Sequence, residues 1–330
     1  MRALTILLVL SLLGAACSAD RSGDPLVVYS GRSEDLVGPL FEQFAAESGI
    51  EIDVRYGDST ELAATLILEG ATSNAQVFFA QDPASIGSVA NAGLLQPLEP
   101  ELAGLVDPRF SDREGRWVGV SARARTVVYN PELITGPLPE SVWELTDPEY
   151  AGLGIAPTNG SFLAFVAAMI MLDGEDQTRA WLEAIAANNP TPFPKNSPIV
   201  AAADAGEIGF GLVNHYYLLQ LQAEQGTTTA KNHFLTAGDA GSLVMPAGIG
   251  ILNSAGDRTA DATALIEFLL SESAQSYFAT QTFEYPVAAG VAAFEGLKPL
   301  DELSSPDLDL TRLSEFLDRA TELVTEAGLV

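Results

Sequence analysis

The sequence predicts an α/β protein with two lobes, in which each lobe is a doubly wound sheet flanked by helices and two crossover strands join the lobes. Strand-like and helix-like segments alternate over residues 26–92, which indicates a parallel sheet. The chain of 330 residues is longer than one hydrophobic core normally covers. Two apolar stretches interrupted by Gly or Ala, at 118–130 and 243–252, are the predicted crossovers. Changes in a few of their backbone angles would let the lobes close around a ligand.

The first lobe begins with a βαβαβ pattern. Short apolar or alternating runs predict its strands, and apolar residues at helical spacing predict the helices between them. Ligands bind such sheets at the carboxyl ends of the strands, so we expect the loops 30–34, 57–60 and 80–82 to converge. The expected strands are 26–30, 50–56 and 75–79, and the expected helices are 33–49, 59–69 (capped by Ser59 or Thr60) and 82–92.

The same patterns continue to the end of the chain. We expect a strand at 207–213 and helices at 161–172, 177–188, 199–205, 216–222, 257–270 and 273–280. The acidic tail, 309–327, repeats Leu and Ala at helical spacing and is expected to pack on the second lobe. We therefore predict a first lobe of 26–122 plus about 248–298, and a second lobe of 123–247 plus about 299–330.

The first residues have the pattern of an export signal. Arg2 precedes an apolar run that is too short to span a bilayer, and residues 1–16 are predicted to be a signal peptide. A buried N-terminal strand is the alternative. Cys17 follows small residues, as in lipoproteins that are cleaved and lipidated there, and the polar segment 17–25 predicts a flexible tether. We expect an exported protein, in the periplasm or on the outer face of the cell membrane, with a lipid anchor on Cys17 as one option.

Composition and charge exclude several classes of function. The chain has 44 acidic and 16 basic residues, a net charge of -28, which argues against nucleic acid or anionic lipid as a partner. Cys17 is the only cysteine, so an internal disulfide and a multi-thiolate metal site are excluded. The sequence has no paired-carboxylate, HExxH, nucleophile-elbow or Cys/His pattern, and we predict that it is not an enzyme.

Two adjacent tyrosines lie in the segment 211–220, Gly-Leu-Val-Asn-His-Tyr-Tyr-Leu-Leu-Gln. The residues before them are apolar and strand-like, and those after them are helical in pattern. Tyr216 and Tyr217 are therefore expected at the carboxyl end of a strand, where ligands bind. The alternative is that both rings pack against the edge of the sheet with their hydroxyls in water.

Several short motifs place this segment in a wider pattern. They are Val28-Tyr29-Ser30-Gly31-Arg32, Val77-Phe78-Phe79-Ala80-Gln81-Asp82, Ser121-Ala122-Arg123-Ala124-Arg125, Leu145-Thr146-Asp147-Pro148, Pro157-Thr158-Asn159-Gly160-Ser161-Phe162, Lys195-Asn196-Ser197, Asn214-His215-Tyr216-Tyr217 and Glu284-Tyr285-Pro286. In this order and spacing the chain resembles the ferric-ion-binding proteins of bacterial ABC importers, which have the type II periplasmic-binding-protein fold. The likeness covers nearly all of the mature chain.

The resemblance implies that Tyr216 and Tyr217 bind Fe(III) as phenolates. Fe(III) is a hard ion that prefers anionic oxygen ligands. The ordinary pKa of a tyrosine is about 10, so a bound cation has to displace its proton. We therefore expect binding to weaken as the pH falls.

The chain departs from the family at some ligand positions. Ser33 stands where many members have His, Gln81 stands where some have Glu, and a further tyrosine near 159–162 is missing. Asp82 and Glu34 are the carboxylates that could add to the metal ligands, although each is equally suited to a helix cap or first turn. His215 is expected to be a surface or supporting residue instead of a ligand.

Two phenolates leave a ferric site incomplete, and in the family a synergistic anion, carbonate or phosphate, completes it. Asn159 opens a predicted helix whose free N–H groups would favour an anion, although a plain N-cap is the alternative. One of Arg123 and Arg125 is expected to face the cleft. The residues expected around the anion or behind the metal ligands are Ser33, Gln81, Arg123, Asn159, Gly160, Ser161, Asn196 and Asn214.

The expected function is that of a monomeric receptor that captures Fe(III) and delivers it to the membrane permease of an ABC importer. A receptor for a small organic anion, such as a phosphonate or a sugar phosphate, is the alternative on the same fold. In that case the two tyrosines would form walls of the anion pocket.

Overall fold

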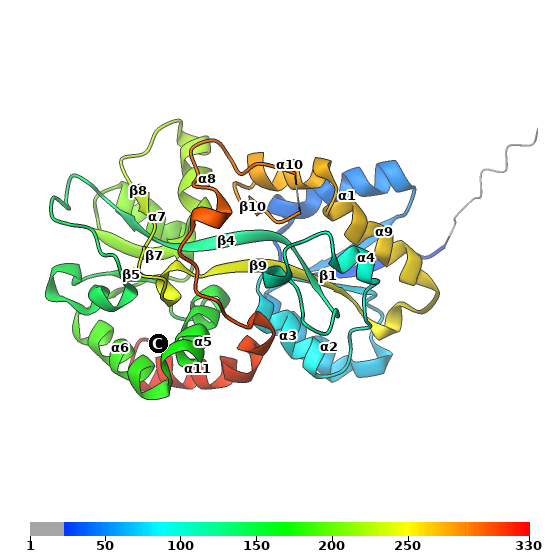
Figure 1. Ribbon diagram of the computed structural model, residues 1–330, viewed down its shortest axis with the longest axis horizontal. Coiled ribbons are helices and arrows are strands. Elements are labelled where there is room, and N and C mark those ends of the chain that lie inside the picture. The colour runs from blue at the N-terminus through cyan, green and yellow to red at the C-terminus, as the bar shows by residue number, and fades with distance from the viewer. Residues whose placement is uncertain (1–22, 289) are drawn as a thin grey trace, which may run out of the picture.

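The computed structural model describes residues 23–288 and 290–330, and its strands form one mixed sheet with helices on both faces (Figure 1). Along the sheet the strand order is β2-β1-β3-β9-β4-β7-β5-β6, and β8 and β10 also pair with β4. The strands are β1 (Leu26–Ser30), β2 (Ile52–Tyr56), β3 (Val77–Ala80), β4 (Val118–Tyr129), β5 (Gly154–Ile155), β6 (Thr191–Pro192), β7 (Phe210–Asn214), β8 (Lys231–His233), β9 (Val244–Ile251) and β10 (Tyr285–Pro286).

Two parallel groups of strands form the ends of this sheet. β1 pairs with β2 and β3, and β5 pairs with β6 and β7, in each case in parallel. We call these groups, with the helices that cover them, the first half and the second half. The long strands β4 and β9 run between the halves, antiparallel to each other, and confirm the predicted crossovers (Figure 1).

The two parallel groups are not separate sheets, because β4 pairs with both halves. It pairs with β9 up to Ala124 and with β7 from Arg125 onward. The junction of the halves along β4 therefore lies between these two residues. Nothing in the residue pattern of this apolar strand indicates that its partner changes there.

Helices cover the two faces of the sheet differently. On one face, a continuous apolar cluster runs from Phe78 beneath α2 and α3 to Phe165 and Trp181 beneath α5, α6 and α11. On the other face the core is divided into a cluster under α1, α9 and α10 and a smaller one under α7. The helices are α1 (Glu34–Ser48), α2 (Ser59–Glu69), α3 (Pro83–Asn91), α4 (Pro100–Ala103), α5 (Gly160–Asp173), α6 (Glu175–Ala187), α7 (Asn196–Asp204), α8 (Tyr216–Gln225), α9 (Thr259–Leu269), α10 (Glu272–Thr280) and α11 (Leu317–Glu326).

Most predicted elements occur within a few residues of their expected bounds, with two informative differences. Asp58, and not Ser59 or Thr60, caps α2, since its carboxylate accepts hydrogen bonds from the N–H groups of Thr60 and Glu61. The tail divides into a 3-10 segment, Leu310–Phe316, and α11. α11 packs on α5 as expected, but the 3-10 segment also packs on α3 of the first half.

The predicted signal peptide (1–16) and Cys17 lie outside the described residues, as does most of the tether. In the part of the chain that the structure describes, no helix is both long and apolar enough to cross a membrane. The exact lobe boundaries, 26–122 plus about 248–298 and 123–247 plus about 299–330, stay a prediction.

Candidate functional site

The loops after the strands of the first half converge, as predicted. The N–H of Gly31 donates to the carbonyl of Phe79 at 2.7 Å, and the N–H of Gln81 donates to Ser59 Oγ at 2.8 Å. Gly31 is required by this close approach, because a Cβ atom there would lie 1.9 Å from Ser59 Oγ. These contacts hold the start of α1 and the start of α3 in fixed positions at the carboxyl edge of the sheet.

The two tyrosines lie where a buried strand passes directly into a helix. β7 ends at Asn214, α8 begins at Tyr216, and the rings of Tyr216 and Tyr217 stack with centroids 4.1 Å apart. Tyr216 is 1% exposed, whereas Tyr217 is partly exposed. The pair therefore lies at the carboxyl end of a strand, as predicted, with its two rings against each other.

A buried charged cluster adjoins Tyr216. Arg32, which follows β1, donates to Glu284 Oε2 at 2.7 Å, and Thr282 Oγ1 donates to the same oxygen at 3.0 Å. Arg123 Nη1 lies 3.9 Å from Glu284 Oε1, and its other amino group donates to the carbonyl of Gln81. Burial opposes the charged form of Arg32, but Glu284 and the two phenols outweigh it and raise the pKa of Arg32.

The environment of Tyr216 favours the protonated form of its hydroxyl. Burial raises the pKa of Tyr216 well above 10, and the charges of Tyr217 and Glu284 add to this effect. Arg32 and Arg123 act in the opposite direction. A cation that binds the phenolate form must therefore displace a firmly held proton.

Arg125 and Asn214, which are register partners on β4 and β7, carry unpaired donors. Both are 1% exposed, and among the described residues no acceptor lies within hydrogen-bond distance of the guanidinium nitrogens of Arg125 or of Asn214 Nδ2. The guanidinium lies against the rings of Phe162 and Phe165, 5.8 and 5.0 Å from their centroids. Burial lowers the pKa of Arg125 to about 9, partly offset by the nearby Tyr217. Such donors favour an anion as a partner.

Four of the residues predicted around the anion, Asn159, Gly160, Ser161 and Asn196, are brought together at the start of α5. Asn159 caps the helix, accepting from the N–H of Ser161 at 3.1 Å and from its hydroxyl at 2.7 Å. Asn196 Nδ2 donates to Asn159 Oδ1 at 3.3 Å. A Cβ atom on Gly160 would lie 3.8 Å from Thr60 Oγ1 and 4.0 Å from Asp82 Oδ2, so the second half meets the first at this point.

The remaining predicted residues differ in how far they are exposed to solvent. Asp82 is 3% exposed and caps α3 through Ser85, and burial raises its pKa in spite of these hydrogen bonds and of Arg123. Ser33 and Glu34 are exposed at the start of α1. Gln81 is partly buried, and its contribution to the cluster is its backbone carbonyl.

Sequence reasoning did not assign a site role to Arg32 or Glu284. Their contact joins residues 252 positions apart, and the only signal was that each falls within a motif. It also left open whether His215 lies at the surface. The ring is fully buried, its Nδ1 accepts from the N–H of Ala124 at 3.2 Å, and its Nε2–H donates to the carbonyl of Phe283 at 2.9 Å.

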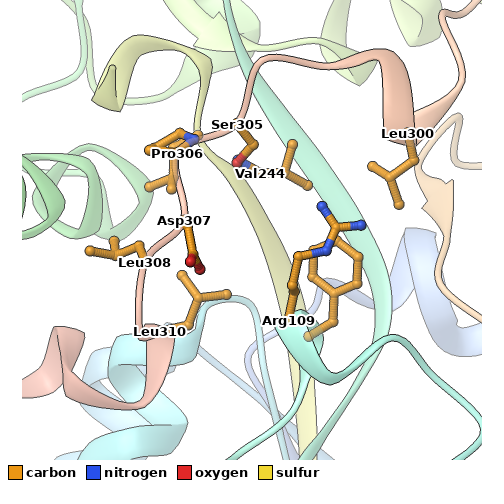
Figure 2. Close-up of a pocket in the computed structure, with 10 residues that line it drawn as sticks. Arg109, Val244, Leu300, Ser305, Pro306, Asp307, Leu308 and Leu310 are labelled. Atoms are coloured by element: carbon orange, nitrogen blue, oxygen red, sulfur yellow. The ribbon is translucent and has the colours of Figure 1, made fainter. Parts of the chain in front are cut away.

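Two other features of the molecule are weaker candidates for a metal-binding site. Within residues 23–288 and 290–330, no group of three or more His, Cys, Asp or Glu side chains could hold a metal ion. A cavity of about 120 Å³ lies between β9 and the segment that precedes α11 (Figure 2). Arg109 and Asp307 line it together with apolar side chains such as Val244 and Leu310, and it contains no phenol. The tyrosine pair is therefore the stronger candidate for a site that binds a hard metal ion.

Known proteins resemble this chain over most of its length. The family model described as bacterial extracellular solute-binding protein matches residues 73–310. The Fe(3+)-binding periplasmic protein of Serratia marcescens is 34% identical over 96% of this chain and 93% of its own. The major ferric iron-binding protein of Neisseria meningitidis serogroup B is 30% identical over 97% and 98%. The crystal structure of iron-bound HitA from Pseudomonas aeruginosa superposes with a TM-score of 0.87, at 34% identity, over 92% of this chain and 99% of that one.

Proposed function

Because this chain belongs to the bacterial extracellular solute-binding proteins, we propose that it captures Fe(III) outside the cytoplasm and delivers it to the permease of an ABC importer. The relatives named as ferric-iron-binding proteins support iron as the cargo. The type II periplasmic-binding-protein fold, with β4 and β9 as the strands between its halves, supplies the hinge on which such a carrier closes. The role is that of a carrier and involves no catalysis.

The stacked pair Tyr216 and Tyr217 is the observation that carries the proposal. Two adjacent phenols at the start of one helix offer two anionic oxygens to a single hard cation once their protons leave. Arg32 and Arg123 lie beside Tyr216, where their charges stabilise its phenolate form. Asp82 and Glu34 stay candidate additional ligands, and Asp82 has the better position because it lies where the two halves meet.

A synergistic anion is the second part of the proposal. Arg125 and Asn214 have buried donors without protein partners, and they lie next to the two tyrosines. Carbonate or phosphate held by these donors, together with the start of α5 at Asn159, Gly160 and Ser161 and with Asn196, would satisfy them and complete the coordination of the metal. Ser33, Gln81 and Arg123 would then line the surroundings of the site.

The test is a titration of the purified protein with ferric nitrilotriacetate in bicarbonate buffer. Phenolate-to-iron charge transfer should give a visible absorption band. Tyr216→Phe and Tyr217→Phe keep the packing of the rings but remove one oxygen each. We expect each to weaken the band and to lower the affinity by more than about 100-fold, beyond the 10–100-fold effect of residues around a metal ligand. Tyr285→Phe is the matched control, since its buried hydroxyl has no partner among the described residues.

The unpaired donors of Arg125 and Asn214 also favour the second candidate function, a receptor for a small organic anion such as a phosphonate or a sugar phosphate. That function predicts a colourless protein that binds its anion without metal, and no loss of affinity for iron in either tyrosine variant. The identity to ferric-binding relatives over nearly the whole chain favours iron.

The proposal extends to the cell. The Serratia marcescens relative is named as a periplasmic protein, which supports export of this chain. A monomeric state, a lipid anchor on Cys17 and a dedicated permease partner belong to the proposal as well. Fractionation of cells, with and without Cys17→Ser, would show whether the exported protein is held at a membrane.

A further inference from the structure

His215, the residue before Tyr216, is fixed on both sides of its ring. It is fully buried, and both of its ring nitrogens are engaged by backbone groups, Nδ1 with the N–H of Ala124 and Nε2 with the carbonyl of Phe283. Its two partners come from different parts of the molecule. Ala124 lies on the crossover strand β4, and Phe283 lies between α10 and β10, on the side of the first half.

The contact with β4 occurs where that strand changes partners. Along β4, β7 pairs from Arg125 onward and β10 pairs at Ala122 and Ser121, so Ala124 lies in the gap between them. The backbone N–H of His215 donates to the carbonyl of Ala124 at 3.0 Å, and the ring accepts the N–H of the same residue. The side chain thus replaces the backbone acceptor that is lost when the chain turns into α8.

The contact with the first half uses a strained residue. Phe283 has a φ of 59°, a left-handed conformation that costs a bulky residue free energy and that persists only where its surroundings hold it. The ring of Tyr285 lies over His215, with centroids 4.8 Å apart. Between them in sequence, Glu284 binds Arg32, which faces Tyr216. Consecutive residues of this segment therefore hold consecutive residues of the β7–α8 turn, His215 directly and Tyr216 through Arg32.

We propose that His215 is a positioning residue for the capture of iron. It ties the turn that carries Tyr216 to the 283–285 segment, and so keeps the phenol beside Arg32 while β4 and β9 bend. His215 does not contact the metal in this role. The inference rests on the proposed binding of Fe(III) by Tyr216 and Tyr217, and it adds to that site the residue that sets the position of one ligand.

Two substitutions separate the two hydrogen bonds of the ring. His215→Asn retains an acceptor near the position of Nδ1 and loses the donor to Phe283, whereas His215→Gln retains a donor near Nε2 and loses the acceptor for Ala124. His233→Gln is the matched control, because the other histidine also bonds a backbone carbonyl, that of Pro139 at 2.7 Å, through Nε2. Each protein is loaded with ferric nitrilotriacetate in bicarbonate buffer. Release of iron to a competing chelator is followed by the charge-transfer band, and the Tm of each iron-free protein is measured.

We expect His215→Asn to release iron about 3- to 10-fold faster than the unaltered protein, the effect of one neutral hydrogen bond. Its charge-transfer band should keep its wavelength, since both phenolates remain. His215→Gln should release iron at a rate within about 2-fold of the unaltered protein, even if its Tm falls, and His233→Gln should not change the rate.

Two results would overturn the inference. One is release from His215→Asn at the unaltered rate. The other is a rate that follows the loss of Tm equally in all three variants, which would make His215 a packing residue only. If His215→Asn does not fold, the Gln variant decides, because a rate raised in proportion to its fall in Tm contradicts the proposal and an unchanged rate supports it. A missing band in the unaltered protein would instead refute the proposed function itself, and with it this inference.

Discussion

The β1–α1 turn and the β7–α8 turn occupy equivalent places in the two halves but have opposite contents. Both connect the carboxyl end of a parallel strand to a helix, and they lie in different halves of the molecule (Figure 1). The first buries a cation, Arg32, and leaves Ser33 and Glu34 exposed. The second buries Asn214, His215 and the phenol of Tyr216. The first half thus supplies fixed charge, and the second half supplies the oxygens that a metal can bind.

The difference lies in whether the buried cations at each turn have a carboxylate partner in the protein without iron. Arg32 is paired with Glu284 Oε2 at 2.7 Å, and Arg123 lies 3.9 Å from the other oxygen of the same carboxylate. On the second half, Arg125 has no such carboxylate among the described residues. Arg32 therefore has a carboxylate partner within the protein, whereas Arg125 has none among the described residues.

Removing the carboxylate that pairs with Arg32 should have the largest effect on stability. Glu284→Gln keeps the shape of the side chain but leaves Arg32 and Arg123 without their carboxylate. We expect the free energy of unfolding to fall by about 3–5 kcal/mol, the usual consequence of leaving a buried charge unpaired. Denaturant unfolding of the iron-free protein measures this. Arg312→Met, which removes an ion pair exposed to solvent on both sides, should destabilise the protein far less, and equal losses in the two variants would contradict the comparison.

The buried histidine of the second half should make stability depend on pH. Burial lowers the pKa of His215 to about 4, while the ordinary value is 6.5, so the unfolded chain takes up a proton before the folded protein does. The stabilising effect is present above pH 6.5 and is lost as the pH falls from about 6.5 to about 4, a change of about 3 kcal/mol. The measurement is the difference in free energy of unfolding between the unaltered protein and His215→Asn over this range. A constant difference would show that the pKa of His215 is the same in the folded and the unfolded protein, and would contradict this prediction.

Replacing the unpaired cation of the second half should have the smallest effect on folding and the opposite sign. Arg125→Met removes a buried charge without a partner and keeps a long apolar side chain beside Phe162 and Phe165. We expect the iron-free protein to become more stable by about 1–2 kcal/mol. Iron affinity should fall in bicarbonate or phosphate buffer, because the anion loses a donor. A less stable protein with unchanged iron affinity would show that Arg125 serves packing alone.

Much of the fold could be predicted from local patterns. Helical and strand periodicity located the βαβαβ units, the crossovers at 118–130 and 243–252, and the passage from strand to helix beside Tyr216, because these depend on which face of each segment is apolar. The parallel groups also followed, since short helices between strands require right-handed crossovers. The cap of α2 was placed one or two residues late, because Asp58, Ser59 and Thr60 are all good capping residues.

The tyrosines, the acidic charge and the absence of a thiolate site were determined by the sequence alone, since they depend on composition and on two neighbouring residues. Only the tertiary structure decided which groups surround them. The pairing of Arg32 with Glu284, the change of partners along β4 at Ala124, and the burial of His215 between Ala124 and Phe283 each join segments far apart in the chain. No local pattern encodes such contacts, because burial and the pairing of charges depend on how complete elements pack against one another.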